Sequence, residues 1–136
     1  MSRPYHEIAG LEHYYFEDSY VLGIHFYPNR IVFDLDVILT ERHGLYRVPQ
    51  PAEQYCFRRA RLSFEDIRNI SELTLLSVHS SDITGERDLG NIDNFVEDGQ
   101  GTYQLSGLWG QAIIDAASVS VTLMDGSLRG EKLPSD

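Results

Sequence analysis

Apolar and polar residues alternate along much of this chain with the two-residue period of β-strands. Residues 118–124 show the alternation most clearly, with Val119, Val121 and Leu123 expected on the inward face and hydroxyl residues on the outward face. Such a strand has one face packed on a core and the other in water. Further segments with the composition of strands are residues 55–64, 72–80 and 102–115.

The segment 55–64 combines an apolar inward face with a basic outward stripe. Arg58 interrupts the inward face, so its charge must find a partner or reach an edge of the sheet. The outward arginines can hold an acidic partner, or they can pair with the carboxylates that the chain carries in excess. The expected inward residues are Cys56, Ala60, Leu62 and Phe64, and the expected outward residues are Tyr55, Phe57, Arg59 and Arg61.

Residues 20–39 predict a β-hairpin, because two β-rich runs flank the turn residues 28–31. A turn with an even number of residues, with Tyr27 opposite Val32, brings the apolar residues of the two runs onto one face. A three-residue turn would instead set Ile24 against Asp34. We therefore expect the even-numbered turn. In that register His25 lies opposite Asp34, and Asp36 follows one step further along the same face.

Six or seven short strands separated by turn signals predict a mainly β protein, an antiparallel sandwich or barrel-like domain. At most one short helix is expected, one or two turns within residues 62–71, which begin with a Ser-x-Glu-Asp start signal. The alternative is an α+β fold. Residues 1–136 are expected to form a single domain with one core, and residues 1–10 and 126–136 to be loosely ordered.

The net charge of −10 is concentrated in one half of the chain, with −2 in residues 1–68 and −8 in residues 69–136. Such a negative field disfavours binding to nucleic acids and to anionic membranes. The sequence has no apolar run long enough for a membrane span and no secretory signal pattern, which favours a cytoplasmic protein. Cys56 is the only cysteine, so neither an intrachain disulfide nor a zinc site with paired thiolates can form, and a buried role is expected for it.

The segment 80–101 holds six carboxylates against one arginine. One interpretation is that these side chains turn and cap the backbone while their charge stays solvated. Calcium binding is a second, although the segment lacks EF-hand spacing and would have to use oxygens of Asp88, Asn91, Asp93 and Asn94. A recognition surface for a basic partner is the third. The six carboxylates are Asp82, Glu86, Asp88, Asp93, Glu97 and Asp98.

Other candidate chemistry is sparse. His25 with Asp34 and Asp36 could be a cross-strand ion pair or part of a metal site. Tyr103 and Trp109 could be core residues, or a stacking platform for a sugar or a partner protein. The five histidines are scattered, and no hydrolase or phosphate-loop motif is present, so catalysis is not indicated.

The hairpin YVLGIHFYPNRIVFDLDVILT, the RLSFEDIRNI step and the YQLSGLWGQAIIDAASVSV segment together resemble small acidic β-rich bacterial proteins, which include immunity proteins of polymorphic-toxin systems. The resemblance implies a domain that neutralises a toxin by masking its active surface, without catalysis of its own. A basic protein such as a toxin would then be the partner, and an acidic surface would suit it. The candidate binding residues, which follow from the sequence and not from the resemblance, are the six carboxylates together with Tyr103 and Trp109. A metal- or carbohydrate-binding sandwich and a small hydrolase are the alternatives.

Overall fold

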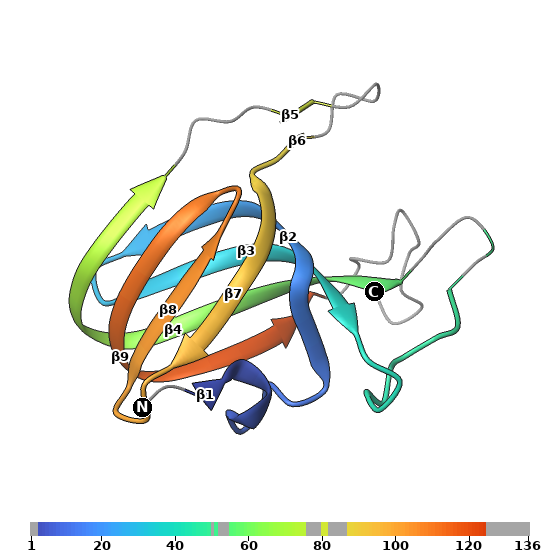
Figure 1. Cartoon of the computed structure of the whole chain (residues 1–136), viewed down its shortest axis with the longest axis horizontal. Coiled ribbons are helices and arrows are strands. Elements are labelled where there is room, and N and C mark those ends of the chain that lie inside the picture. The colour runs from blue at the N-terminus through green and yellow to red at the C-terminus, as the bar shows by residue number, and fades with distance from the viewer. Residues whose placement is uncertain (1–2, 50, 52–54, 76–79, 82–86, 125–136) are drawn as a thin grey trace.

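The computed structural model in Figure 1 describes residues 3–49, 51, 55–75, 80–81 and 87–124, without the side chains of residues 80, 81, 87 and 88. A short strand and one turn of 3-10 helix precede the main strands. The elements in order are β1 Arg3–Pro4, η1 Tyr5–Glu7, β2 Tyr14–Tyr27, β3 Arg30–Leu39, β4 Cys56–Leu75, β5 Ser80–Ser81, β6 Arg87–Asp88, β7 Gly90–Glu97, β8 Thr102–Gly107 and β9 Gly110–Leu123.

The main sheet closes on itself as an antiparallel barrel of six strands, which confirms the predicted class and selects its barrel form. The strands follow the order β7-β2-β3-β4-β9-β8, and β8 pairs back with β7 (Figure 1). Strand β1 extends the sheet along β7 through the Arg3–Glu97 and Pro4–Val96 pairs. Closure gives each of the six strands two neighbours, although β4 beyond Glu65 pairs with β9 alone.

The β2–β3 hairpin has the predicted faces next to its turn, but the turn itself differs. The turn contains two residues, Pro28 and Asn29, so Tyr27 pairs with Arg30 rather than with Val32. Between Ile24 and Tyr27 the true register differs from the predicted one by two positions. Because the side-chain period is also two, the faces are unchanged there, and Ile24 lies opposite Phe33 on the inner side. A bulge between Val21 and Gly23 then exchanges the faces, so Val21 is buried and Tyr20 is exposed, contrary to the predicted register.

The predicted helical turns within residues 62–71 are wrong, because these residues belong to the single long strand β4. Asp66 has a positive φ of 54°, and the pairing with β9 shifts register just after it, between Ile67 and Asn69. A long strand that bends around a narrow barrel needs such bulges. The polar residues that suggested a helix start therefore mark a bulge. The predicted strand 72–80 is the continuation of β4 as far as Leu75.

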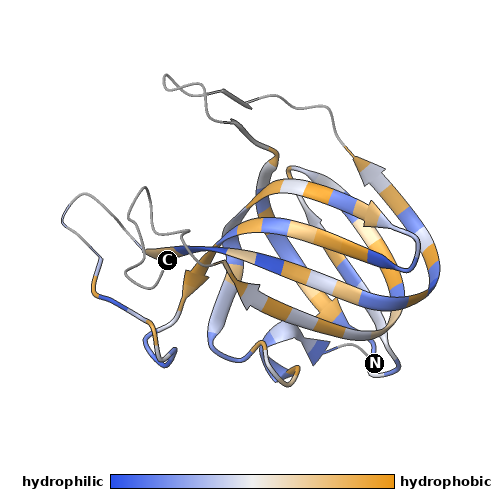
Figure 2. Cartoon of the chain, turned by 180° about the vertical axis from the view of Figure 1, so that it is seen from behind, coloured by the Kyte–Doolittle hydropathy of each residue, from blue (hydrophilic) through white to orange (hydrophobic). Residues whose placement is uncertain are grey.

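Aromatic side chains fill the barrel interior. Six strands enclose less space than the eight that side chains alone can just fill, so a solid core is expected. Figure 2 shows the alternation of apolar and polar residues along the strands that supplies it. Five of the largest side chains are exposed by less than 2 %: Trp109, Phe16, Phe33, Phe64 and Phe95.

The N-terminal segment packs against the core instead of lying loose. Tyr5, Ile8 and Leu11 are exposed by 3 %, 6 % and 0 % and belong to the same core cluster as the barrel residues. The Tyr5 hydroxyl also accepts a hydrogen bond from the backbone N–H of Phe16 at 3.2 Å. Burial of this apolar surface holds residues 5–11 against the barrel. The predicted loose end at 126–136 lies outside the described residues.

Candidate interaction surface

The structure describes the side chains of three of the six carboxylates of the acidic segment. Asp82 and Glu86 lie outside the described residues, and Asp88 is described only by its place in β6. Asp93 is exposed on β7, where it accepts a hydrogen bond from the side-chain amide of Asn91 at 2.8 Å. Among Asp82, Glu86, Asp88 and Asp93, the side chain of Asp93 alone is described, and it lies on the outside of the barrel.

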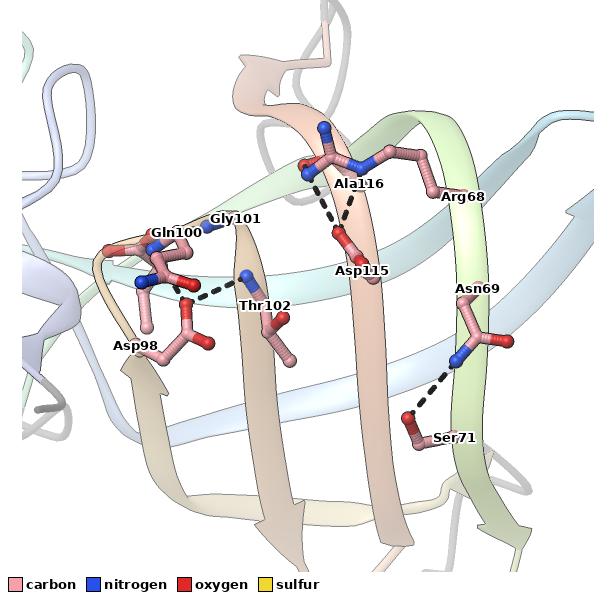
Figure 3. Close-up of polar contacts among 10 residues, drawn as sticks. Arg68, Asn69, Ser71, Asp98, Gln100, Gly101, Thr102, Asp115 and Ala116 are labelled. Atoms are coloured by element: carbon pink, nitrogen blue, oxygen red, sulfur yellow. Dashed lines mark hydrogen bonds and ion pairs between the residues drawn. The ribbon is translucent and has the colours of Figure 1, made fainter.

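Glu97 and Asp98 stabilise the turn between β7 and β8. Glu97 is exposed by only 4 % and contacts the Arg3 side chain at 2.6 Å and the Gly101 N–H at 2.9 Å. Burial alone would raise the pKa of this carboxyl, but these donors overcome it and hold the pKa below its usual value. Asp98 accepts hydrogen bonds from the backbone N–H groups of Gln100 and Thr102, at 2.7 and 3.1 Å, which lower its pKa (Figure 3). Both carboxylates therefore have structural partners.

Tyr103 and Trp109 point into the core, with 6 % and 1 % of their surface exposed. Trp109 packs edge-to-face on Phe33 with ring centroids 5.4 Å apart, and Tyr103 contacts Phe64 at 5.2 Å. Rings in this position offer no open face for stacking on a sugar. Their placement agrees with a role in the core and not with a stacking platform.

His25 and Asp34 do meet on the outer face, although the register sets Val32 opposite His25. The contact is diagonal, with 2.7 Å between His25 Nε2 and Asp34 Oδ2, and the second Asp34 oxygen accepts a hydrogen bond from Arg61 Nε at 3.2 Å. Asp36 lies opposite Arg59 in the β3–β4 pairing. Among the described residues, no group of three or more His, Cys, Asp or Glu side chains is placed to hold a metal ion.

Aromatic side chains also gather on the outer face near the start of β4, where a core role is not available. We call Tyr15, Tyr20, Tyr55 and Phe57 the tyrosine surface. Its ring centroids form a chain, with 6.2 Å between Tyr15 and Tyr55, 6.0 Å between Tyr55 and Phe57, and 6.0 Å between Phe57 and Tyr20. Ile38 of β3, exposed by 3 %, is the outward residue of the strand between them.

A cavity of about 220 Å³ adjoins the tyrosine surface. Tyr15 and Tyr55 line it together with Tyr46 from the connection that follows β3, and Glu41 and Thr40 contribute polar groups. The connection is held in place by backbone hydrogen bonds from Thr40 N–H to His13 at 3.1 Å and from Tyr46 N–H to His43 at 3.1 Å. The remaining lining residues are Ile38, Leu39, Pro49 and Cys56.

His43 anchors the connection through both ring nitrogens. Nδ1 accepts the Leu45 N–H at 3.0 Å, so the neutral ring carries its proton on Nε2 and donates it to the Tyr14 hydroxyl at 3.1 Å. Burial lowers the pKa of His43, and the charges of His13 and Arg58 lower it further. The inward Arg58 is half-buried at this end of the barrel, and its Nε has no hydrogen-bond partner among the described residues.

A second, more polar cleft of about 570 Å³ adjoins the first. Thr40 and Glu41 line both spaces, so the two lie side by side at this end of the barrel, and we call them together the depression. Its other lining residues are His6, Glu12, His13 and Arg42. Sequence reasoning placed Tyr55 and Phe57 on the outward face of their strand, but it did not single out this depression. Its walls come from three chain segments that approach one another only in the folded protein.

The depression has an acidic side. Burial is the first cause of the raised pKa of the Tyr15 hydroxyl, and the negative charges of Asp18 and Glu17 raise it further. Glu41 is exposed at the point where the two spaces meet. A cation entering the cavity would therefore approach carboxylates and tyrosine rings together.

No protein-family model, curated protein or solved structure matches this chain. Helices in the described part of the chain are too short and polar to cross a membrane.

Proposed function

We propose that this protein is an interaction module that binds a basic protein partner through its outer surface, as an immunity protein or other inhibitor would. The observation that carries the proposal is the filled barrel. Because the described interior is occupied by Trp109, the phenylalanines and the aliphatic residues, recognition has to use the outside. The outside offers aromatic rings and a depression at one end of the barrel.

Charge supports a basic partner. The chain carries 21 acidic residues against 11 basic ones, and a net charge of −10 attracts cationic proteins over long range. Complementary charge of this kind accelerates encounter and suppresses wrong partners. The described ion pairs hold the basic residues Arg3, Arg30, Arg61 and Arg68, which leaves the excess of carboxylates to set the sign of the field.

The test is capture of partners from an extract of the native host by the immobilised full chain, followed by quantitative mass spectrometry. We expect the enriched proteins to be basic. Raising the salt from about 0.1 M to about 1 M should release them, because it shortens the Debye length from about 10 Å to about 3 Å. Captured candidates are then purified and their affinity is measured directly, so that enrichment alone does not decide the result.

Two variants distinguish an effect of the negative charge on binding from an effect of disturbing the fold. Neutralising the acidic segment with D82N, E86Q, D88N and D93N should weaken binding of the purified partner severalfold. The control R68Q with D115N removes the exposed ion pair of Figure 3 without changing the net charge, and should leave binding unchanged. Partners that are acidic, or binding that depends neither on salt nor on the four neutralised carboxylates, would contradict the proposal.

A further inference from the structure

The cavity beside the tyrosine surface is small and aromatic. Its volume of about 220 Å³ lies below the roughly 300–1,000 Å³ of sites that enclose a whole small molecule. It suits one side chain of a larger partner. Three tyrosines from separate segments, Tyr15, Tyr46 and Tyr55, contribute to its wall, and such residues are enriched at the energetic centres of protein interfaces.

The chemistry of the cavity selects a positively charged planar group. Tyrosine rings attract cations through the negative potential of their faces, and a guanidinium group also stacks flat on them. Glu41, at the edge of the cavity, can accept two parallel hydrogen bonds from such a group. The protein already uses this contact elsewhere, since the Arg30 guanidinium carbon lies 4.5 Å from the centre of the Tyr27 ring.

The electrostatic surroundings agree with this selection. After burial, the charges of Asp18 and Glu17 raise the pKa of the Tyr15 hydroxyl, so the Tyr15 side of the cavity lies in a negative potential. A neutral aliphatic side chain would gain the apolar contacts with Ile38 and Leu39 but would leave Glu41 without a charged partner. An acidic side chain would be repelled.

We propose that this cavity is the pocket for an arginine anchor of the partner, with the guanidinium group stacked between the tyrosine rings and paired with Glu41. The inference rests on the proposed function, because it assigns the residue type through which the basic partner is held. It also locates the centre of the interface at the start of β4.

The probe is N-acetyl-L-arginine methylamide, titrated into the full chain while tyrosine ring and backbone resonances are followed by NMR. The citrulline analogue is the matched ligand control, because it has nearly the same shape without the charge. We expect saturable shifts at Tyr15, Tyr46 and Tyr55, with citrulline binding weaker by about fivefold or more, the effect of one partly desolvated cation–π contact.

Variants locate the site. Glu41→Gln and Tyr55→Leu should each weaken arginine binding about fivefold or more, while Tyr27→Leu, at an exposed tyrosine 48 % accessible on the β2–β3 hairpin, should leave it unchanged. Circular dichroism verifies that each variant is folded. If Tyr55→Leu fails to fold, Glu41→Gln still tests the site, because Glu41 is exposed.

Two results would overturn the inference. One is arginine binding that does not saturate, or that citrulline matches. The other is a purified basic partner whose affinity is unchanged by Glu41→Gln and Tyr55→Leu. In that second case the proposed function would stand, because salt and the acidic-segment variant would still weaken the partner. Failure of the proposed function would give a different result, a captured partner that is not basic.

Discussion

Replacing Trp109 with alanine tests whether the ring belongs to the core or to a binding surface. The ring is 1 % exposed and packs edge-to-face on Phe33, with an angle of 78° between the ring planes. Truncating a buried tryptophan costs about 3–5 kcal/mol, against a total stability of roughly 5–15 kcal/mol for a domain of this kind. For 136 residues this should lower the midpoint of thermal unfolding by roughly 10–20 °C.

Trp109→Phe should be much milder, for a specific reason. The indole Nε1 is buried without a hydrogen-bond partner among the described residues. Leaving such a donor buried costs about 1–3 kcal/mol, and phenylalanine removes this penalty while it keeps most of the contact with Phe33. The smaller ring also leaves a cavity, whose cost equals or exceeds this gain. We expect a net loss of about 0–2 kcal/mol.

The assay is urea unfolding of each variant, followed by far-UV circular dichroism, with the slope of the transition used to verify that the surface exposed on unfolding is unchanged. Leu108→Ala is the control, because its side chain is the neighbour in sequence but is 59 % exposed, and it should cost about 0.5 kcal/mol or less. The reasoning is refuted if Trp109→Ala costs less than about 1 kcal/mol. It is refuted in part if phenylalanine is as damaging as alanine, which would mean that the N–H group is satisfied.

Three further measurements test other parts of the structure. Gly110→Ala should destabilise the fold by at least about 1–3 kcal/mol, because φ is +137° and a Cβ would collide with a backbone carbonyl, whereas Gly44→Ala has open space and should be neutral in the same urea assay. Burial lowers the pKa of His43 in the folded protein. As the pH falls, the imidazole therefore takes up a proton in the unfolded chain at a higher pH than in the folded one. The stability of the fold should fall as the pH drops from about 6.5 through the lowered pKa of the folded state. His43→Gln removes the titrating group and can still reach the Tyr14 hydroxyl, so it should flatten this dependence. Thermal melts between about pH 7 and pH 5 provide the measurement. Millimolar calcium or EDTA should leave the unfolding midpoint unchanged, since the described residues hold no group of metal ligands; a rise of several degrees with calcium would establish a site in residues 80–101.

The two-residue alternation was sufficient to predict the fold class and most of the inward residues. Val119, Val121 and Leu123 pack against the core as expected, and Cys56, Ala60, Leu62 and Phe64 are buried. The hairpin register was wrong by two positions next to the turn, where the faces were still right. Beyond the bulge between Val21 and Gly23 the predicted faces were wrong, because Val21 lies inside and Tyr20 outside. The same period that identifies a strand cannot distinguish registers that differ by two residues, because both place the same side chains inside.

The bulge at Asp66 was not predictable from local pattern. A short polar run after a serine is compatible with a helix start and with a bulge, and the choice depends on whether β4 must bend around a barrel. Strands β7 and β8 are neighbours in the chain and form a local hairpin. The barrel closes through the long-range pairing of β2 with β7, such as Glu17 with Ile92, so nothing local distinguishes a barrel from a sandwich. The N-terminal segment likewise became ordered only because Tyr5 and Leu11 found apolar surface to cover.

The sequence by itself determined the strand content, the sign and distribution of charge, and the outward positions of Tyr55 and Phe57. Each of these depends on the residues themselves or on neighbours a few positions away. Only the tertiary structure decided which carboxylates of the acidic segment have structural partners, that Trp109 is enclosed, and that Tyr15, Tyr46 and Tyr55 surround one cavity. The cavity residues lie as many as 40 positions apart in the chain, and only the closure of the barrel and the path of its connections bring them together.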